Sequence, residues 1–315
     1  MQHNKKSTPS DSAAYHIPVM LQECLDGLDI RPEGVYVDVT FGGGGHSRGI
    51  LSRLSKSGRL IAFDQDADAA RNLPDDPRIT FVHANFAEIK PFLRLHGVKE
   101  VDGILADLGV SSHQLDTAER GFSYRFEADL DMRMNIAEEN TAAQILNGYS
   151  AARLQDVFSR YGEVRNSKTL AEAIVQQRGS RPIRTTSDLK AVMRPLIRGD
   201  EHRYLAQVFQ ALRMEVNKEM EVLEAFLCSC KDVLKPEGRI VVLTFHSLED
   251  RAVKNFFKTG NCAGEPVRDF YGNIDRPFEL MNKKAIEASA EEKRQNSRSQ
   301  SAKLRIAKFV GHKFD

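Results

Sequence analysis

Residues 35–54 read VYVDVTFGGGGHSRGILSRL, and this stretch decides the fold class. Residues 35–40 are mostly apolar and β-branched, which predicts a buried strand, and residues 47–54 have the pattern of a helix. Four consecutive glycines at 42–45 join the two. Glycine lets a ligand approach the backbone closely, and a helix N-terminus offers unpaired N–H groups. The stretch therefore predicts a strand-to-helix turn that binds a ligand.

The same alternation of strand and helix continues downstream. Further buried strands are expected at 59–64, 79–83, 102–108 and 239–245, with crossover helices at 67–73 and 86–95. Such alternation is typical of an α/β, doubly wound and mostly parallel sheet. The alternating segment 302–310 predicts a closing antiparallel edge strand, and the polar segment 283–300 predicts mobile chain.

A helical insertion interrupts this alternation. No strand pattern occurs from 132 to 203, where helices are expected at 151–160, 168–178 and 187–197. A long amphipathic stretch, 205–234, then carries one apolar stripe that is expected to face one core. The sequence thus predicts a disordered tail at 1–14, a discontinuous α/β domain at 15–131 and 206–315, and an inserted all-helical domain at 132–205.

Composition is that of an ordinary soluble globular protein. The 315 residues are 41% hydrophobic and 28% charged. No apolar run reaches about 20 residues and the polar start does not resemble a signal peptide, so a cytoplasmic protein without a membrane span is expected. The four cysteines lack the spacing of a zinc site, and no metal is expected.

The net charge of +1 is unevenly distributed along the chain. Residues 151–203 hold 11 Lys and Arg against 6 Asp and Glu, and residues 283–308 hold 8 against 3. The rest of the chain is therefore acidic. Two basic tracts on an acidic body indicate either a phosphate-binding footprint or solvated helix surfaces.

Three other kinds of site use a glycine-rich turn. A P-loop requires Gly-Lys-Ser/Thr, which this loop lacks, and a nicotinamide site requires a third glycine that no frame supplies. Gly45-His46-Ser47-Arg48-Gly49 matches the nucleophile elbow of α/β hydrolases, with His246 downstream as a candidate base. However, this elbow would follow the first strand, where no earlier segment furnishes an oxyanion hole. A hydrolase that uses Ser47 is therefore the weaker alternative.

Acidic residues at two strand ends favour an adenosyl cofactor instead. Asp64 ends the second strand about twenty residues after the glycines, where a carboxylate accepts hydrogen bonds from a ribose. Asp107 ends the fourth strand, and open parallel sheets bind ligands outside these carboxyl ends. The nearby Asp66 is expected to cap a helix. The pattern favours a methyltransferase that uses S-adenosylmethionine (SAM).

The chain also carries a series of longer motifs. They are HIPVML (16–21), VDVTFGGGGHS (37–47), DGILADLGVSSHQLDTAERGFSYRFEADLDMRM (102–134), YGE (161–163), FQALRMEVNKE (209–219), TFHSLEDRAVKNFF (244–257) and SAKLRIA (301–307). With these motifs in this order, the chain closely resembles the bacterial small-subunit ribosomal RNA cytosine-N4 methyltransferase family, known as RsmH or MraW.

The resemblance implies a class I SAM-dependent methyltransferase fold, which is Rossmann-like, with a helical insertion. It implies methyl transfer from SAM to N4 of a cytosine in the decoding centre of 16S rRNA, with the small ribosomal subunit as partner. By motif, the implied cofactor-binding residues are Gly44, Gly45, His46, Asp64, Phe86, Asp107 and Gln114. The chain departs from the family pattern at His113, at 126–129 and at 203–207.

Catalysis is expected to depend on orientation, because the SAM sulfonium is already a good leaving group and requires no metal. Asp107 and the loop with Ser111 and Ser112 are candidates to accept hydrogen bonds from the cytosine amine. The two serines also suit turn and cap roles. His246, after the fifth strand, is a candidate for substrate contact or for the core, and Ser247 for a helix cap.

Candidate substrate-binding residues lie in the motif at 102–134. Phe122, Tyr124 and Phe126 alternate, so they are expected to share one face and either stack on an unstacked cytosine or pack in the core, and Arg133 is the fourth candidate. The basic insertion, assisted by the C-terminal tract, is the expected RNA-facing element. A catalytically silent SAM-binding assembly factor is the other alternative, and the sequence leaves open a homodimer.

Overall fold

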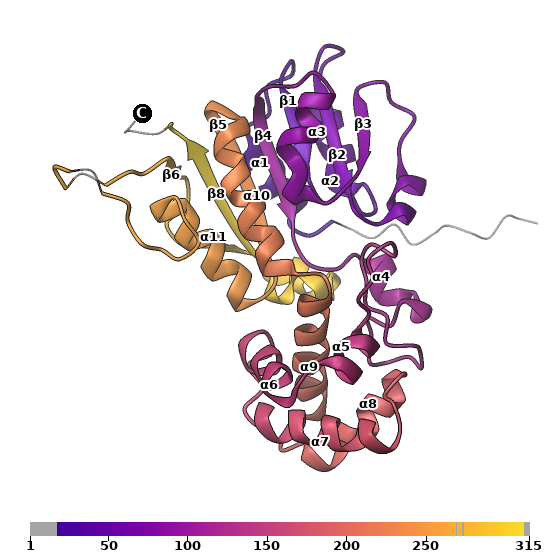
Figure 1. The fold of residues 1–315 in the computed structure, drawn as a ribbon. Coiled ribbons are helices and arrows are strands. Elements are labelled where there is room, and N and C mark those ends of the chain that lie inside the picture. The colour runs from indigo at the N-terminus through magenta and orange to yellow at the C-terminus, as the bar shows by residue number, and fades with distance from the viewer. Residues whose placement is uncertain (1–17, 269, 273, 312–315) are drawn as a thin grey trace, which may run out of the picture.

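The computed structural model describes residues 18–268, 270–272 and 274–311, so the predicted tail at 1–14 lies outside the described residues. The described residues form an eight-stranded sheet in the order β3-β2-β1-β4-β5-β8-β6, with β7 paired to β8 (Figure 1). The strands are β1 (Val35–Asp38), β2 (Arg59–Asp64), β3 (Ile79–His83), β4 (Val101–Asp107), β5 (Leu234–Thr244), β6 (Phe278–Leu280), β7 (Ile286–Glu287) and β8 (Lys303–Phe309).

The first five strands are parallel, whereas β8 runs antiparallel to β5, β6 and β7. The prediction of five parallel strands is thus confirmed. These strands are continuous apolar runs because both faces of a parallel sheet are covered by helices. On β5, Val241 and Leu243 enter one core and Ile240 and Val242 the other, since successive side chains point to opposite faces.

Helices cover both faces of the sheet, as Figure 1 shows. One face carries α1 (Leu21–Leu28) and α2 (Gly45–Arg53). The opposite face carries α3 (Ile89–Leu95), α10 (Glu219–Val233) and α11 (Ser247–Thr259). Because the first five strands are parallel, the loops that leave their carboxyl ends gather at one edge of the sheet.

The remaining large helices form a separate body below that edge (Figure 1). They are α5 (Ala142–Gly148), α6 (Ala151–Arg160), α7 (Ser167–Ser180), α8 (Thr186–Met193) and α9 (Glu201–Val216). Their core takes apolar side chains from Phe122 through Val216. The division at residues 132 and 205 remains a prediction, but the packing of the helical body extends beyond it on both sides.

The amphipathic stretch 205–234 forms two helices, α9 and α10, rather than one that faces a single core. The break lies at Asn217 and Lys218, where Lys218 adopts a left-handed φ of 50°. Val208 on α9 packs in the helical body, whereas Phe226 on α10 packs against the sheet. Periodicity does not reveal this break, because the apolar spacing continues across it.

Three further predictions are wrong in detail. The segment 67–73 forms a 3-10 helix, Ala67–Asn72, rather than an α-helix. The segment 302–310 forms β8, which is antiparallel as predicted but lies inside the sheet between β5 and β6. The segment predicted as mobile chain, 283–300, contains β7, α12 (Ala290–Gln295) and most of a 3-10 helix, Ser297–Ser301. Very short elements of this kind have no periodic signal.

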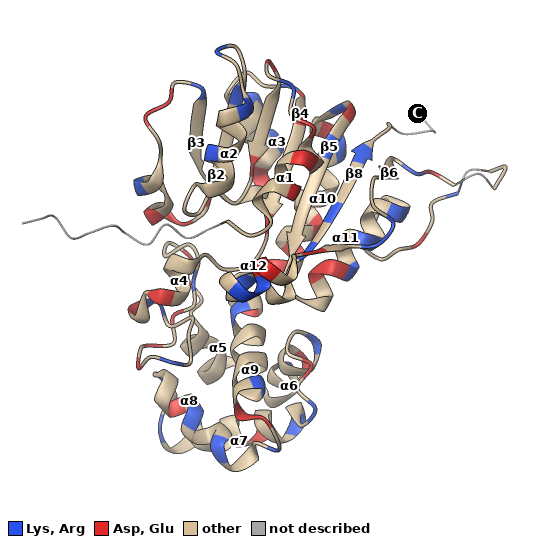
Figure 2. Ribbon diagram, turned by 180° about the vertical axis from the view of Figure 1, so that it is seen from behind, with Lys and Arg blue, Asp and Glu red and all other residues tan. Residues whose placement is uncertain are grey.

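The two basic tracts differ in how their side chains are placed. Figure 2 shows Lys and Arg along α6, α7 and α8 of the helical body, and many are exposed: Arg160, Arg165, Lys168, Arg181, Arg184, Arg194 and Arg198. In the C-terminal tract, Lys308 pairs with Glu237 and Arg305 with Asp250. Those charges are balanced within the fold.

No helix in the described part of the chain is long and apolar enough to cross a bilayer.

Candidate cofactor-binding and catalytic site

The glycine loop lies at the carboxyl end of β1 and leads into α2. Gly44 has a φ of 74° and is the N-cap of α2, without a side chain that caps the helix. A Cβ at Gly43 would meet no atom within 4 Å, whereas one at Gly45 would lie 2.7 Å from Pro18. The loop therefore presents bare backbone and helix N–H groups on one side and packs tightly on the other.

Asp64, at the end of β2, holds this loop in place. Its two carboxylate oxygens accept hydrogen bonds from the backbone N–H of Gly42 at 2.7 Å and of Asp66 at 2.8 Å. Each oxygen retains a second lone pair, which suits the hydroxyls of a ribose. Burial raises the pKa of Asp64 to about 6.

Asp107 ends β4, two strand positions from Asp64 in the sheet. Its Oδ1 has no hydrogen-bond partner and its Oδ2 lies 3.6 Å from Nδ1 of His46. The other ring nitrogen of His46, Nε2, donates to the carbonyl of Val19 at 3.0 Å, which orients the imidazole. Burial raises the pKa of Asp107, while His46 and Arg298 act in the opposite direction. Because buried polar atoms are nearly always hydrogen-bonded, this oxygen marks a position where a ligand would complete the hydrogen bonding.

Phe86 lies at the start of the 3-10 helix that follows β3. Its ring packs edge-on against Phe226 of α10, with centroids 5.2 Å apart. A narrow pocket beside it is lined by Gln65, Leu108, Gly109, Met134, Asn217, Glu219, Val222, Leu223 and Glu249. The apolar ring next to the end of β2 suits the flat base of an adenosine. The glycine loop, Asp64 and Phe86 thus fit SAM together, and the unpartnered oxygen of Asp107 lies at the same edge of the sheet.

Gln114 is buried, and both ends of its side-chain amide are already bonded. Its oxygen accepts from the backbone N–H of Ser111 at 3.1 Å, and its nitrogen donates to Oδ2 of Asp66 at 2.9 Å. Ser111 completes this capping box at the start of α4 (Ser112–Asp116). Asp66 caps the 3-10 helix Ala67–Asn72, as predicted. Cofactor contact by Gln114 stays a prediction, and its observed contacts hold the two loops together.

Arg120 completes this network, which sequence reasoning missed. Its Nη1 lies 2.9 Å from Oδ2 of Asp66, and its Nη2 donates to the carbonyls of Arg133 and Met134. Both partners of the ion pair are largely buried, at 13% and 10% side-chain exposure. The only signal in the sequence is its place inside the motif at 102–134.

His246 lies at the N-terminus of α11 and is its N-cap, the role predicted for Ser247. Its Nδ1 accepts from the backbone N–H of Glu249 at 3.4 Å, and its Nε2 lies 3.1 Å from Oε1 of Glu249 without hydrogen-bond alignment. Burial acts to raise the pKa of Glu249, but His246 and other neighbours outweigh it and the pKa is lowered. The predicted cap is thus one residue off, because α11 starts at Ser247 itself. The hydroxyl of Ser247 donates to Glu163 instead.

Glu219 stands with His246 and Glu249 as a group whose ligand atoms lie within 4.8 Å of one another. Arg213 binds both oxygens of Glu219, at 2.7 and 2.8 Å, and Glu249 accepts from the N–H of Phe245. The cluster therefore already contains a cation, the guanidinium. The expectation that the protein uses no metal stays a prediction.

The aromatic residues predicted to share one face do not do so, because the chain turns at Tyr124 and Arg125. Phe122 is 6% exposed in the core of the helical body, and Tyr124 packs edge-on against Phe209 at 5.8 Å. Phe126 is 41% exposed and is the one of the three that solvent reaches freely. Alternation places residues on one face only while the backbone stays extended.

Arg133 turns back onto its own loop. Its Nε and Nη2 bind both carboxylate oxygens of Asp131, at 2.8 and 2.7 Å, and its Nη1 donates to the carbonyls of Ile136 and Glu138. Substrate contact by Arg133 stays a prediction, and the observed contacts shape the loop before α5.

Ser47 is fully buried, and its hydroxyl donates to Oδ2 of Asp38 at 2.6 Å. Burial raises the pKa of Asp38. A nucleophile elbow requires an exposed hydroxyl next to a base. The structure therefore contradicts the hydrolase alternative.

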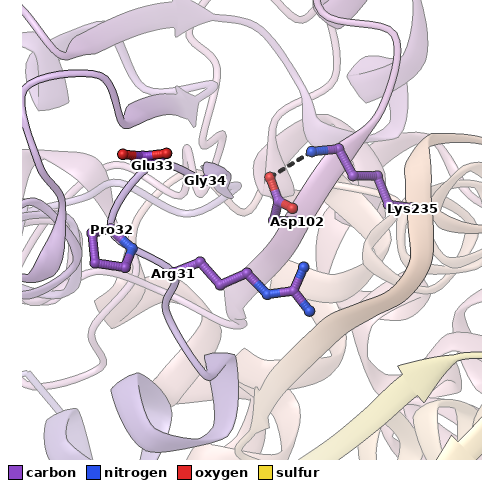
Figure 3. Close-up of a pocket in the computed structure, with 6 residues that line it drawn as sticks. All are labelled: Arg31, Pro32, Glu33, Gly34, Asp102 and Lys235. Carbon is purple, nitrogen blue, oxygen red and sulfur yellow. Dashed lines mark hydrogen bonds and ion pairs between the residues drawn. The ribbon is translucent and has the colours of Figure 1, made fainter.

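A hollow of about 380 Å³ lies at the opposite edge of the sheet (Figure 3). It is lined by Arg31, Pro32, Glu33, Gly34, Asp102 and Lys235. Asp102 accepts from Lys235 Nζ and from the N–H of Val35, each at 2.8 Å. Because this hollow lies at the amino ends of β1 and β4, it is separate from the edge where parallel sheets bind ligands.

The strand order, the glycine loop and the acidic strand ends define a class I, Rossmann-like SAM-dependent methyltransferase. The chain belongs to the MraW methylase family, whose sequence profile matches residues 13–310. S-adenosylmethionine is its cofactor and methyl transfer is its reaction. The family expected from the sequence motifs is thus confirmed.

Two relatives illustrate this membership. The protein from Parabacteroides distasonis named Ribosomal RNA small subunit methyltransferase H is 56% identical over 300 residues, which cover 95% of this chain and 98% of the relative. Its namesake from Cytophaga hutchinsonii is 55% identical over 296 residues, 93% and 99% of the two chains. The solved structure of an rRNA methylase from Streptococcus thermophilus is also similar. The alignment covers 92% of this chain and 95% of the other chain, at 11% identity and a TM-score of 0.39.

Proposed function

We propose that the protein transfers a methyl group from SAM to the exocyclic N4 of a cytosine in the decoding centre of 16S rRNA, within the small ribosomal subunit in the cytoplasm. Support for an rRNA substrate comes from the names of its relatives. Support for the cytosine amine comes from the motifs at 37–47, 102–134 and 244–257. The observation that carries the proposal is the unpartnered Oδ1 of Asp107 at the tip of β4.

An amine acceptor requires a hydrogen-bond acceptor that orients its N–H groups. The N4 lone pair of cytosine is delocalised into the ring, so a carboxylate that accepts from N4–H localises the lone pair and stabilises the developing positive charge. Asp107 Oδ1 is that acceptor, because it is a buried oxygen with no competing partner.

The cofactor supplies the methyl group on a sulfonium, which is a good leaving group. The chain's residues hold and orient the reactants. Asp64 and the N–H groups of the glycine loop bind the adenosyl side, and His46, oriented by Val19, lies against Asp107 on the reacting side. In-line alignment of donor and acceptor supplies up to about 7–11 kcal/mol of catalysis.

Methylated N4 must lose one proton to restore neutrality, and Asp107 accepts it. Burial raises the pKa of Asp107, so its carboxylate is a stronger base than an exposed aspartate. Ser111 and Ser112 support the loop after Asp107 rather than take the proton, since Ser111 caps α4 and the Ser112 hydroxyl accepts from Arg298. His246 shapes the end of β5 together with Glu249.

The helical body provides the RNA-facing surface. Its exposed Arg and Lys side chains suit phosphate contacts, so binding should weaken steeply with salt. Phe126, at 41% exposure, is the aromatic residue available to stack on a displaced base. Binding of small subunits that did not respond to salt would contradict this assignment.

The decisive experiment uses SAM with a labelled methyl group and small subunits from cells that lack the modification. We expect label on one decoding-centre cytosine, identified by nuclease digestion and mass spectrometry, and loss of turnover in Asp107→Asn with SAM still bound. Label on another base, or on an oxygen or carbon atom, would refute the proposed target. SAM binding without any turnover would instead indicate the silent assembly factor.

A further inference from the structure

The C-terminal segment contacts the loop that leaves β4. Arg298 Nη1 donates to the hydroxyl of Ser112 at 2.6 Å, and its Nη2 donates to the carbonyl of Val110. These partners lie 186 and 188 residues away in the sequence. Two nitrogens of one planar guanidinium therefore hold two points of the same loop, a geometry that a lysine cannot reproduce.

Arg298 is itself held firmly. Its backbone N–H donates to the side chain of Asn296, and the neighbouring Ser299 is fully buried. Preceding it, α12 is tied to the start of α1, because Oε1 of Glu292 accepts from the N–H of Met20 at 2.7 Å. Figure 2 shows α12 between the carboxyl edge of the sheet and the helical body. The guanidinium thus projects from a well-anchored segment.

The loop that it holds has few other supports. After Leu108 bonds to the carbonyl of Leu243, the chain leaves the sheet and Gly109 adopts a φ of 91°. The next anchored backbone group is the N–H of Ser111, which Gln114 binds. Residues 109 and 110 lie between these two anchored N–H groups, and they follow Asp107 and Leu108 in the chain.

The geometry points to Arg298 as a positioning residue for methyl transfer: it clamps the 108–112 loop so that Asp107 and the following carbonyls face the acceptor amine. This inference rests on the proposed function, in which that loop receives the amine. It gives one basic side chain of the C-terminal tract a role inside the catalytic centre instead of on an RNA-facing surface. The positive charge also favours the ionised form of the neighbouring Asp107.

The test compares Arg298→Ala and Arg298→Lys with a control, Arg294→Gln. Arg294 is an exposed arginine of the same segment that pairs with Glu291. Three quantities are measured in full-length protein: the dissociation constant for SAM, kcat and KM on small subunits, and amide hydrogen exchange of peptides that cover 108–116.

We expect Arg298→Ala to raise exchange in 108–116 by at least about tenfold and to lower kcat by about 10- to 100-fold, because a small misplacement of reacting groups costs rate on this scale. The SAM dissociation constant should change by less than about threefold, since the glycine loop and Asp64 are untouched. Arg298→Lys should lie between alanine and wild type, and Arg294→Gln should match wild type. Added methylguanidine should restore part of the kcat of Arg298→Ala, and methylammonium should restore less.

The outcomes separate this inference from the proposed function. If wild type modifies no rRNA, the proposed function fails, while hydrogen exchange still reports whether Arg298 holds the loop. If wild type is active but Arg298→Ala keeps wild-type kcat, or keeps wild-type exchange in 108–116, the clamp is refuted. If Arg298→Ala does not fold, Arg298→Lys decides by the same two readouts.

Discussion

The side-chain oxygen of Asn217 accepts a hydrogen bond from the backbone N–H of Met134, at 2.7 Å and across 83 residues of sequence. Its amide nitrogen donates to the carbonyls of Met132 and Arg213, both at 2.8 Å. Asn217 lies at the break between α9 and α10, so this side chain ties the junction of the two bodies to the loop before α5. Met134 in turn contacts Gln65, and both residues line the narrow pocket beside Phe86.

Asn217→Ala should destabilise the protein by about 2–4 kcal/mol, because each buried polar group left without a partner costs about 1–3 kcal/mol. Urea unfolding, monitored by circular dichroism, measures the change. The matched control is Asn140→Ala, which replaces an exposed asparagine in the same loop, a few residues after Met134. Equal midpoints for the two variants would contradict the role of Asn217.

Asp64 should make SAM binding depend on pH. Its pKa in the fold is about 6, raised by burial, and ribose hydroxyls donate to the ionised form. Affinity should therefore rise about tenfold between pH 5 and 7 and then level off, whereas Asp64→Asn should bind weakly with little change over this range. Titration calorimetry at several pH values measures this. Wild-type affinity that stays constant from pH 5 to 7 would exclude the assignment.

Asp64 also makes the free energy of unfolding depend on pH, but in the opposite direction: SAM affinity rises with pH, whereas this contribution to stability falls. Because the folded pKa lies above the unfolded value of 3.8, the native state retains a proton that the unfolded chain releases. The contribution of Asp64 to stability is therefore greatest below pH 4 and is lost as pH rises towards 6. Without SAM, Asp64→Asn should reduce this part of the pH dependence of unfolding.

Arg120→Ala should cost about 3–5 kcal/mol of stability, because it leaves the buried Asp66 carboxylate without its counter-charge. A double variant that also carries Asp66→Asn should lose less than the sum of the single changes, which a double-mutant cycle of unfolding free energies reveals. Arg125→Ala, at an exposed arginine of the following loop, serves as control. Strict additivity would show that the two side chains do not interact.

Ser47→Ala should retain methyl transfer and lose about 1–3 kcal/mol of stability, because buried Asp38 loses the hydroxyl that donates to it at 2.6 Å. Wild-type protein should remain unlabelled by an active-serine fluorophosphonate, since Ser47 is fully buried. Covalent labelling at Ser47, detected by mass spectrometry, would revive the hydrolase alternative.

The sequence alone determined the parallel sheet, the glycine turn and the acidic strand ends. The predicted strands at 59–64 and 79–83 coincide with β2 and β3, because a buried strand needs a continuous apolar run that is visible locally. The positions of Asp64 and Asp107 follow from the same runs, since each aspartate ends one. Motifs carried the family assignment for the same reason: they are local patterns of residues.

Only the tertiary structure decided which distant side chains meet. Nothing in the local pattern around Lys218 marks the break that sends α9 and α10 into different cores, because the apolar spacing is the same on both sides. Arg298 with Ser112, Arg120 with Asp66 and Asn217 with Met134 are pairs formed by chain packing over long separations. Hydrogen-bonding capacity is written in each residue type, but the choice of partner depends on where packing brings the backbone.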